Sequence, residues 1–471
     1  MTLALFLPLI HPTNFAPTVL YFGGIGVFFY SATKRPEAGL YYIIPLLPLQ
    51  TLRYKLHDFP LGAQWIDLML LGSMLGAWRK GQSIFPRTGL TKLVLILAVV
   101  TYISLWRGSF FLNAPLPLWF SDPRVSDWKN YLVIPLLFFV TTACVKEPKQ
   151  MKIMLFCMCL TVLSLNRAFI NTMSHRDMSA FSYDIRDAGA MGYAGVNGLA
   201  ALEACFSVFL MSMYSLHKER WPRLGYLFML GTCLVALMYT MSRGGYAALL
   251  IGSFFVGVIK NKKLLVILVL FLCTWQTLVP PAVRDRVYMT HDDNGQLDPS
   301  AGDRVRLWEN AEGYIKANPG FGTGFDTYKF MHALGPYADT HNYYIKVMLE
   351  QGIIGLFIFL AILLNLFFRG FALYRTTSAD GFSRGLGFGL ASMVVACAIT
   401  NLFGDRWTYI EETGYMWVIA GFVARCQLLS EEKSSEEENL EDLAIQSGEP
   451  EMPAEVMPLI GRATILGSQT S

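Results

Sequence analysis

The most informative polar residue of the sequence is Arg243, which interrupts a long apolar stretch. Residues 224–259 are largely apolar on both sides of the break Ser242-Arg243-Gly244-Gly245. The pattern predicts that Ser242 caps a following helix, whose N-terminal N–H groups then point to the same place as the Arg243 guanidinium. The two glycines would let a ligand approach the backbone, and a phosphate group suits this arrangement because a guanidinium binds two of its oxygens at once. The alternative is an interfacial arginine that only reaches lipid headgroups.

A second group of candidate residues lies further along the chain, in a long polar stretch. Arg304 and Arg306 follow Gly302-Asp303, and Arg304 shares one face with Trp308 if residues 303–316 form a helix. A surface helix with solvated arginines is the alternative to a ligand site. The helix would also have an apolar stripe that we expect to lie on the membrane surface, formed by Trp308, Ala311, Tyr314 and Ile315.

His341 is the candidate general base. Asp339 or Thr340 is positioned to cap a helix over 342–368, which would place His341 in its first turn. The positive end of the helix dipole disfavours a further positive charge there, so we expect a neutral imidazole that is able to accept a proton. A polar cap without a chemical role is the alternative.

Other polar residues give weaker signals. The turn His291-Asp292-Asp293-Asn294-Gly295 could bind a divalent cation, but it lacks the spacing of a calcium loop, so a solvated turn is favoured. Glu203, Lys346 and Glu350 are charges within predicted spans, where such groups are functional or pair with one another. The sequence contains no Gly-x-Ser-x-Gly, His-Glu-x-x-His or P-loop motif, and we predict neither a metal site nor a cofactor.

The elements that position these residues are predicted transmembrane helices. The chain has 471 residues, of which 54% are hydrophobic and 15% charged, and its mean hydropathy is +0.40. Soluble domains carry about 25% charged residues, and apolar runs of about 20 residues are long enough to cross a bilayer. We therefore predict an all-α polytopic membrane protein with twelve or thirteen crossings and no nucleic-acid partner. The predicted spans are 17–31, 38–52, 63–79, 90–106, 129–145, 150–170, 193–216, 223–241, 243–260, 263–281, 342–368, 384–403 and 411–429.

Lysine and arginine residues predict the orientation of these spans. They are concentrated in alternate short connections, which the positive-inside rule assigns to the cytoplasm. One helix over 224–259 would be about 54 Å long against a hydrocarbon core of about 30 Å, so the chain must turn near Arg243. On this assignment Arg243 and His341 lie on the same, extracytoplasmic face. The predicted parts are spans one to ten in 1–281, an extracytoplasmic loop with short helices in 282–341, spans eleven to thirteen in 342–429, and a disordered acidic cytoplasmic tail in 430–471.

Three motifs make the chain similar to the O-antigen ligase and polymerase superfamily of bacterial inner-membrane proteins, over about residues 190–370. The first motif is Ser242-Arg243-Gly244. The second is Gly302-Asp303-Arg304 with Trp308 and the downstream Pro319-Gly320-Phe321-Gly322. The third is His341-Asn342 with Glu350, Gly352 and Gly355-Leu356, and the order and spacing of all three resemble those of the family.

The resemblance implies a GT-C-like fold and a metal-independent glycosyltransferase whose donor is an undecaprenyl-diphosphate-linked glycan. It implies that Arg243 and Arg304 hold the diphosphate, although Arg306 is close enough to Arg304 to take its role. His341 would be the base that acts on the acceptor hydroxyl, at the periplasmic face of the inner membrane. The acceptor stays open between a lipid A core, a second lipid-linked glycan and a protein serine or threonine. A transporter or lipid flippase is the alternative function, which predicts charges near the membrane midplane and an internal repeat.

Overall fold

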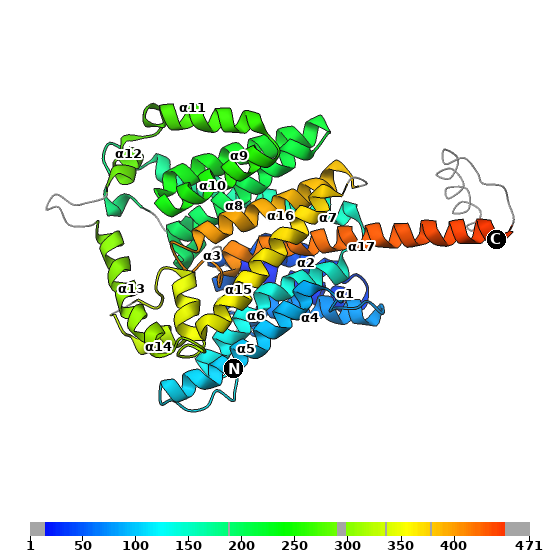
Figure 1. The fold of residues 1–471 in the computed structure, drawn as a ribbon, viewed down its shortest axis with the longest axis horizontal. Helices are drawn as coiled ribbons and strands as arrows, with labels where there is room; N and C mark the ends of the chain where they lie inside the picture. The colour runs from blue at the N-terminus through cyan, green and yellow to red at the C-terminus, as the bar shows by residue number, and fades with distance from the viewer. Residues whose placement is uncertain (1–14, 187–188, 290–297, 335–336, 377–378, 448–471) are drawn as a thin grey trace. The chain divides into compact units, whose positions relative to one another are not determined.

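The computed structural model describes residues 15–186, 189–289, 298–334, 337–376 and 379–447, and within them all regular elements are helices (Figure 1). Seven of these helices are long and apolar enough to cross a membrane. A backbone that crosses lipid must satisfy its own hydrogen bonds, which a helix does within one segment. The protein is therefore an all-α polytopic membrane protein, as predicted. The seven helices are α1 (Phe15–Thr33), α5 (Gly89–Phe111), α7 (Pro148–Ser174), α8 (Gly195–Leu216), α9 (Arg220–Thr240), α15 (Tyr343–Arg375) and α16 (Gly381–Thr400).

Further helices coincide with predicted spans without meeting the same criteria of length and apolarity. The apolar helix α10 (Arg243–Ile259) has 17 residues, and α11 (Lys262–Leu278) bends by 113° into α12 (Pro281–Tyr288). Counted as one, that bent pair would make an eighth span. The total of twelve or thirteen crossings therefore stays a prediction for the other segments, which contain α4 (Trp65–Arg79), α6 (Pro123–Cys144) and α17 (Ile410–Ser447).

The second predicted span, 38–52, is wrong as a single helix. The structure divides it into α2 (Glu37–Ile43), the short 3-10 helix η3 (Ile44–Leu46) and α3 (Gln50–Leu56). Two prolines, Pro45 and Pro48, lie at the division, and a proline removes a backbone N–H and clashes with the preceding turn. After the break, α3 packs against η6 (Gly189–Ala194) and α1.

The helix α8 is the centre of the bundle. It packs against α9, α10 and α16, and α15 packs against α16 and α5 (Figure 1). Small residues allow the helices to approach. A Cβ on Gly385 of α16 would lie 2.9 Å from Sδ of Met213 in α8, and a Cβ on Gly389 would lie 2.5 Å from the Phe209 ring. Glycines four residues apart are a common contact surface between membrane helices.

Short elements between α11 and α15 cover one end of the bundle. They include α13 (Pro299–Ala317) and α14 (Thr327–Met331), which both contact α15. The predicted helix over 303–316 is confirmed, but the prediction that its apolar stripe lies on the membrane is wrong. The stripe packs on protein instead, in a cluster formed by Leu307, Ala311, Tyr328 and Leu349 with Trp308, Tyr314 and Ile315 at its edge.

The backbone of residues 430–447 continues α17 as a helix up to Ser447. The sequence predicted disorder from residue 430, because this segment is acidic and nearly free of aromatic residues. Glutamate, the most frequent residue of the segment, is a strong helix former, and this intrinsic preference accounts for the difference. The rest of the predicted tail, 448–471, lies outside the described residues.

Candidate functional site

The turn between α9 and α10 positions Arg243 as the first residue of α10. Met241 has a φ of +51°, and Ser242 is extended, so the chain reverses direction within two residues. The prediction that the Ser242 side chain caps α10 is wrong, since it makes no capping hydrogen bond. The turn itself is the predicted one, and it places the Arg243 side chain at the end of the bundle that carries α12 and α13.

The glycines after Arg243 allow helix packing and not the predicted approach of a ligand. A Cβ on Gly244 would lie 2.8 Å from Cβ of Phe403, and a Cβ on Gly245 would lie 2.8 Å from Cβ of Ala200. Protein atoms therefore already occupy the space beside both residues.

Arg243 is held by Asp298, which no motif singled out. Nη2 of Arg243 lies 2.6 Å from Oδ2 of Asp298, and Nη1 donates to the Met289 carbonyl at 2.5 Å. Oδ1 of Asp298 lies 3.0 Å from Nη1 of Arg286 and also accepts a hydrogen bond from the Tyr183 hydroxyl. Burial raises the pKa of Asp298, but the hydrogen bonds from Tyr183 and Arg286 outweigh it, so the pKa lies below its ordinary value. Asp298 is thus an ionised bridge between guanidinium groups on α10 and α12.

Further guanidinium groups surround this bridge. Burial and then the charge of Arg243, followed by those of Arg406 and Arg286, lower the pKa of Arg304. Burial also lowers the pKa of Arg186, and the nearby charges of Arg286 and Arg304 add to this effect. Charges act on one another over several ångströms, so these side chains share one region without all being in contact; Arg406 itself is paired with Glu412 at 3.3 Å. We call these residues the arginine cluster, and its members are Arg186, Arg243, Arg286, Arg304 and Arg406.

Arg304 and Arg306 have different surroundings, although they are two residues apart. Arg304 is half-buried, its Nη1 lies 3.3 Å from both oxygens of Ser300, and its buried Nε has no partner among the described residues. The side chain of Arg306 is 71% exposed and pairs with Asp303. The structure therefore brings Arg304 together with Arg243 and leaves Arg306 on the surface.

His341 directly precedes α15 and does not lie in its first turn as predicted. The capping residue is Asn342, whose Oδ1 accepts hydrogen bonds from the backbone N–H groups of Tyr344 and Ile345. His341 itself has a φ of +51°, in the left-handed region. The predicted caps, Asp339 and Thr340, lie three and two residues before the observed cap.

Asp339 instead binds the imidazole of His341. Nδ1 of His341 lies 2.8 Å from Oδ1 of Asp339, and the backbone N–H of His341 donates to the same oxygen at 2.6 Å. Burial opposes ionisation of Asp339, but the hydrogen bond from His341 and the charges of His341 and Lys346 bring its pKa well below the ordinary value. A carboxylate on Nδ1 fixes the proton on that nitrogen and leaves Nε2 to accept one.

Two hydrogen bonds tie the His341 segment to α13. The Tyr337 hydroxyl donates to Oδ2 of Asp303 at 2.6 Å, and Nε1 of Trp308 donates to the Thr340 carbonyl at 3.0 Å. The two residues of α13 that make these bonds are close to Arg304 along the helix: Asp303 directly precedes it, and Trp308 follows it by four residues. This arrangement brings the predicted base to the helix that carries one of the predicted anion ligands.

The glycine-rich run 318–324 supplies the backbone hydrogen bonds that a break in α15 leaves unmade. At Gly352, with a φ of +64°, the helix is interrupted, and the N–H groups of Ile353 and Ile354 donate to the carbonyls of Pro319 and Gly320. In return the carbonyls of Leu349 and Glu350 accept the N–H groups of Thr323 and Gly324. A Cβ on Gly322 would lie 2.3 Å from the Glu350 carbonyl carbon, so the loop can come this close to α15 only because residue 322 is a glycine. The second and third sequence motifs are thus one structural unit.

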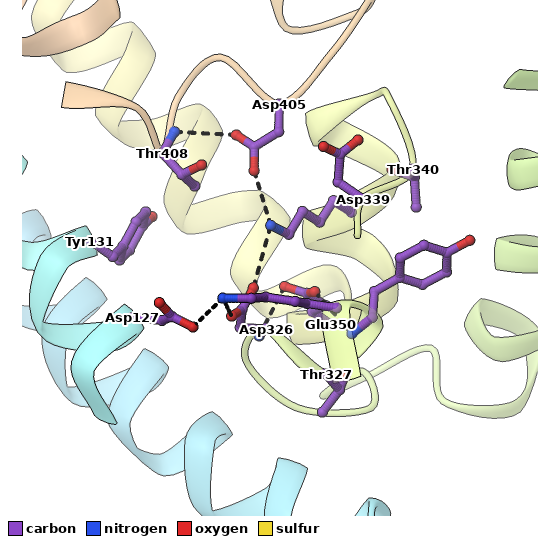
Figure 2. Close-up of polar contacts among 12 residues, drawn as sticks. Asp127, Tyr131, Asp326, Thr327, Asp339, Thr340, Glu350, Asp405 and Thr408 are labelled. Carbon is purple, nitrogen blue, oxygen red and sulfur yellow. Dashed lines mark hydrogen bonds and ion pairs between the residues drawn. The ribbon is translucent and has the colours of Figure 1, made fainter. Parts of the chain in front are cut away.

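The charges at the start of α15 form an ion-pair network with neighbouring loops (Figure 2). Nζ of Lys346 lies 3.0 Å from Oδ2 of Asp405 and 3.5 Å from Oδ1 of Asp326. The Glu350 carboxylate accepts backbone N–H groups of Asp326 and Tyr328 at 3.1 and 3.3 Å. The interpretation as a charge paired within the bundle is therefore confirmed for Lys346, whereas Glu350 bonds to backbone N–H groups.

The remaining predicted polar residues lie elsewhere. Glu203 is fully buried in α8, where Nδ2 of Asn166 lies 3.3 Å from its carboxylate. The possible cation turn His291–Gly295 lies outside the described residues. Within the described ranges, no three histidine, cysteine or acidic side chains are grouped so that they could hold a metal ion.

Several residues of the site carried little signal in the sequence. Asp339 and Asp298 are single acidic residues in a polar stretch, and Arg186 and Arg286 lie in connections that contain other charges. A charge beside an apolar run could have indicated Arg406, since Asp405-Arg406 lies in the short connection between the last two predicted spans. Their importance comes from contacts across the fold.

A comparison with curated proteins finds no match to the chain. Residues 227–360 match a family model described as O-antigen ligase. The matched segment contains Arg243, Arg304, Arg306 and His341, as well as the break of α15 and the loop that repairs it. This match and the helical membrane fold support the resemblance of the motifs to the O-antigen ligase and polymerase superfamily, and residues 227–360 are the segment that is similar to it.

Proposed function

We propose that this protein transfers a glycan from an undecaprenyl-diphosphate carrier to an acceptor hydroxyl at the extracytoplasmic face of a bacterial inner membrane. The general role of a glycan-transferring enzyme of the O-antigen ligase and polymerase type is supported by the family match. The observation that carries the specific proposal is the arginine cluster, whose Arg304 lies on the helix α13 to which the His341 segment is hydrogen-bonded, together with the carboxylate of Asp339 on His341.

The arginine cluster suits a diphosphate. Two guanidinium groups, those of Arg243 and Arg286, share one carboxylate, Asp298, and the buried Nε of Arg304 has no partner in the described part of the chain. Arginine binds phosphate oxygens in a fixed planar geometry that lysine cannot provide. A diphosphate would supply both the negative charge and the acceptor atoms that this cluster lacks.

The reaction follows from the charges. The acceptor oxygen attacks the anomeric carbon of the donor sugar, the bond from that carbon to the diphosphate oxygen breaks, and the lipid diphosphate leaves with the bonding electrons. Negative charge grows on the leaving group in the transition state, so fixed guanidinium groups of Arg243 and Arg304 stabilise the transition state more than the ground state. Nε2 of His341 accepts the proton of the acceptor hydroxyl, a contribution of about 10²- to 10⁴-fold in rate.

Transfer by the purified full-length protein in lipid nanodiscs tests the proposal. With an undecaprenyl-diphosphate-linked oligosaccharide and an extract of candidate acceptors, the wild type should release undecaprenyl diphosphate and form a glycosylated acceptor. Arg243→Ala and His341→Ala should form neither product. If the wild type moved the lipid-linked glycan across a bilayer without cleaving it, the protein would be a flippase and the proposal would be wrong.

A further inference from the structure

A cavity of about 540 Å³ lies beside the pair formed by His341 and Asp339. Asp339 is one of the residues that line it and His341 is not, so the contact between Asp339 and Nδ1 joins the cavity to the imidazole. Its volume falls in the range of ligand cavities, about 300 to 1,000 Å³. The walls come from α3, the start of α4, α6, the loop before α14, the start of α15 and residues 405–411.

The charge of this cavity is opposite to that of the arginine cluster. Its walls contain three basic side chains, Arg53, Lys329 and Lys346, against seven carboxylates. Figure 2 shows four of these carboxylates converging from different elements: Asp127, Asp326, Asp339 and Asp405. A phosphate or carboxylate ligand would meet an excess of negative charge here, so the cavity disfavours anions. The carboxylates can instead accept hydrogen bonds from hydroxyl groups.

Gln50 gives an independent indication of a ligand. It is 2% exposed and lines the cavity, yet neither Oε1 nor Nε2 of its side chain has a partner among the described residues. A buried amide without hydrogen bonds costs free energy, so such groups are rare unless a ligand or water satisfies them. An amide offers one acceptor and two donors, which complements hydroxyl groups that both donate and accept.

Aromatic side chains complete the walls. Trp65, Tyr54 and Tyr409 line the cavity together with the carboxylates. Aromatic rings present an apolar face and a polar edge, which matches a sugar ring with its C–H face and its hydroxyl rim. An inorganic cation is a poorer occupant, because the described residues contain no group of three ligands placed to hold one.

We propose that this cavity binds the acceptor, and that the acceptor is an uncharged, hydroxyl-rich saccharide whose hydroxyl groups bond to Gln50 and the surrounding carboxylates. The inference rests on the proposed function, since it assigns the second substrate of the same site. The two substrates are then separated by charge: the diphosphate lies on the arginine cluster, and the neutral saccharide lies in the acidic cavity that Asp339 joins to His341.

Direct binding to the donor-free protein tests the proposal. Saturation-transfer NMR would be recorded on the full chain in detergent with maltose, cellobiose, lactose and N,N′-diacetylchitobiose, and with glucose 6-phosphate as the anionic comparison. At least one neutral disaccharide should bind, and the phosphate ester should bind more weakly. Gln50→Leu should weaken disaccharide binding about 5- to 150-fold. The same change should leave the melting temperature unchanged or raise it, because it removes an unsatisfied buried amide.

A matched pair of variants tests the place of binding. Ala63 lines the cavity and Gln64 does not, although both are exposed neighbours in the short helix η4 (Gly62–Gln64). Ala63→Trp should abolish disaccharide binding and Gln64→Trp should not. The proposal is overturned if no disaccharide binds the wild type, if both tryptophan variants bind equally, or if glucose 6-phosphate binds best. A failure of the proposed function looks different: disaccharide binding would persist while no lipid-diphosphate donor is cleaved.

Discussion

Nδ1 of His341 and Oδ1 of Asp339 are 2.8 Å apart, and this contact joins the predicted base to a carboxylate that also lines the acidic cavity. A carboxylate in this position stabilises the positive charge that develops on the imidazole when Nε2 accepts a proton. The contact therefore has a kinetic consequence that a merely structural histidine cap would not have.

The first prediction concerns the coupling of these two residues. His341→Ala should lower the turnover number about 10²- to 10⁴-fold while donor affinity stays near normal, because a base acts on the acceptor and not on the diphosphate. Asp339→Asn should lower the turnover number by a smaller factor than His341→Ala, since the amide carries no charge to stabilise the imidazolium. The double variant should be no slower than His341→Ala alone, as expected for residues that act as a unit. Additive losses in a transfer assay would mean that Asp339 acts independently of His341.

The second prediction concerns pH. Transfer should slow as the pH falls through the range in which imidazoles become protonated, and this limb should be absent from His341→Ala. Asp339 cannot produce the limb: its pKa is lowered in the folded protein, so its contribution to stability is present above the ordinary aspartate value of about 3.9 and is lost only below it. Melting temperatures measured alongside the rates should therefore show no loss from this group between pH 5 and pH 8. A limb that survives in the variant would exclude His341 as the base.

Arg243 gives the third prediction. Arg243→Lys should lose most transfer activity although the charge is kept, because one ammonium cannot replace two separately bonded nitrogens, Nη1 and Nη2. Arg304→Ala should act similarly, and Arg306→Ala is the matched control, since its side chain is 71% exposed and bonded to Asp303. Initial rates over a range of donor concentrations would measure all three. Wild-type transfer by Arg243→Lys, or equal losses for Arg304→Ala and Arg306→Ala, would contradict this assignment.

Features of the fold that depend on residues near one another in the sequence could be predicted, and features that depend on distant residues could not. Helix positions follow from apolar runs, which are local, and the turn before Arg243 follows from length alone. The break at Pro45 and Pro48 was missed because the prolines lie within an apolar run. The helical continuation of α17 was missed because composition was weighed above intrinsic helix propensity.

The site was predictable where one residue type carries the chemistry by itself. Arg243, Arg304 and His341 stood out as arginines and a histidine in motifs. Asp298 did not, because it joins segments whose proximity only the fold reveals, and Asp339 was predicted only as a possible helix cap and not as the partner of His341. The exposed position of Arg306 likewise depends on which face of α13 packs on the protein.

The fourth prediction concerns orientation in the membrane. If the end of the bundle that carries α13 is extracytoplasmic, Lys316→Cys should react with a membrane-impermeant maleimide in intact cells, because Lys316 is 72% exposed. Lys260→Cys, at the other end of α10, should react only after the membrane is opened. The exposed native Cys273 must first be replaced by serine. The reverse labelling pattern would invert the orientation that the Lys/Arg distribution predicts.

The fifth prediction tests the break in α15 as the support of the site. Gly352 has a φ of +64°, and a Cβ there would lie 2.3 Å from the Gly320 carbonyl oxygen, so Gly352→Ala must strain the backbone and push the glycine-rich loop away. A left-handed residue other than glycine costs about 1 to 3 kcal/mol, and displacing the loop also removes hydrogen bonds that satisfy the broken helix. We therefore expect a lower melting temperature in detergent and reduced transfer.

Gly313 provides the matched control for this change, because it lies within α13 and has no atom within 4 Å of an added Cβ. Gly313→Ala should stabilise the protein by about 0.5 to 1 kcal/mol, since alanine loses less conformational entropy than glycine in a helix. Thermal unfolding followed by tryptophan fluorescence would compare the two variants. If Gly352→Ala melted at the wild-type temperature with full activity, the loop 318–324 would tolerate displacement. In that case the hydrogen bonds between this loop and α15 would not be needed to position Asp326 and the start of α15.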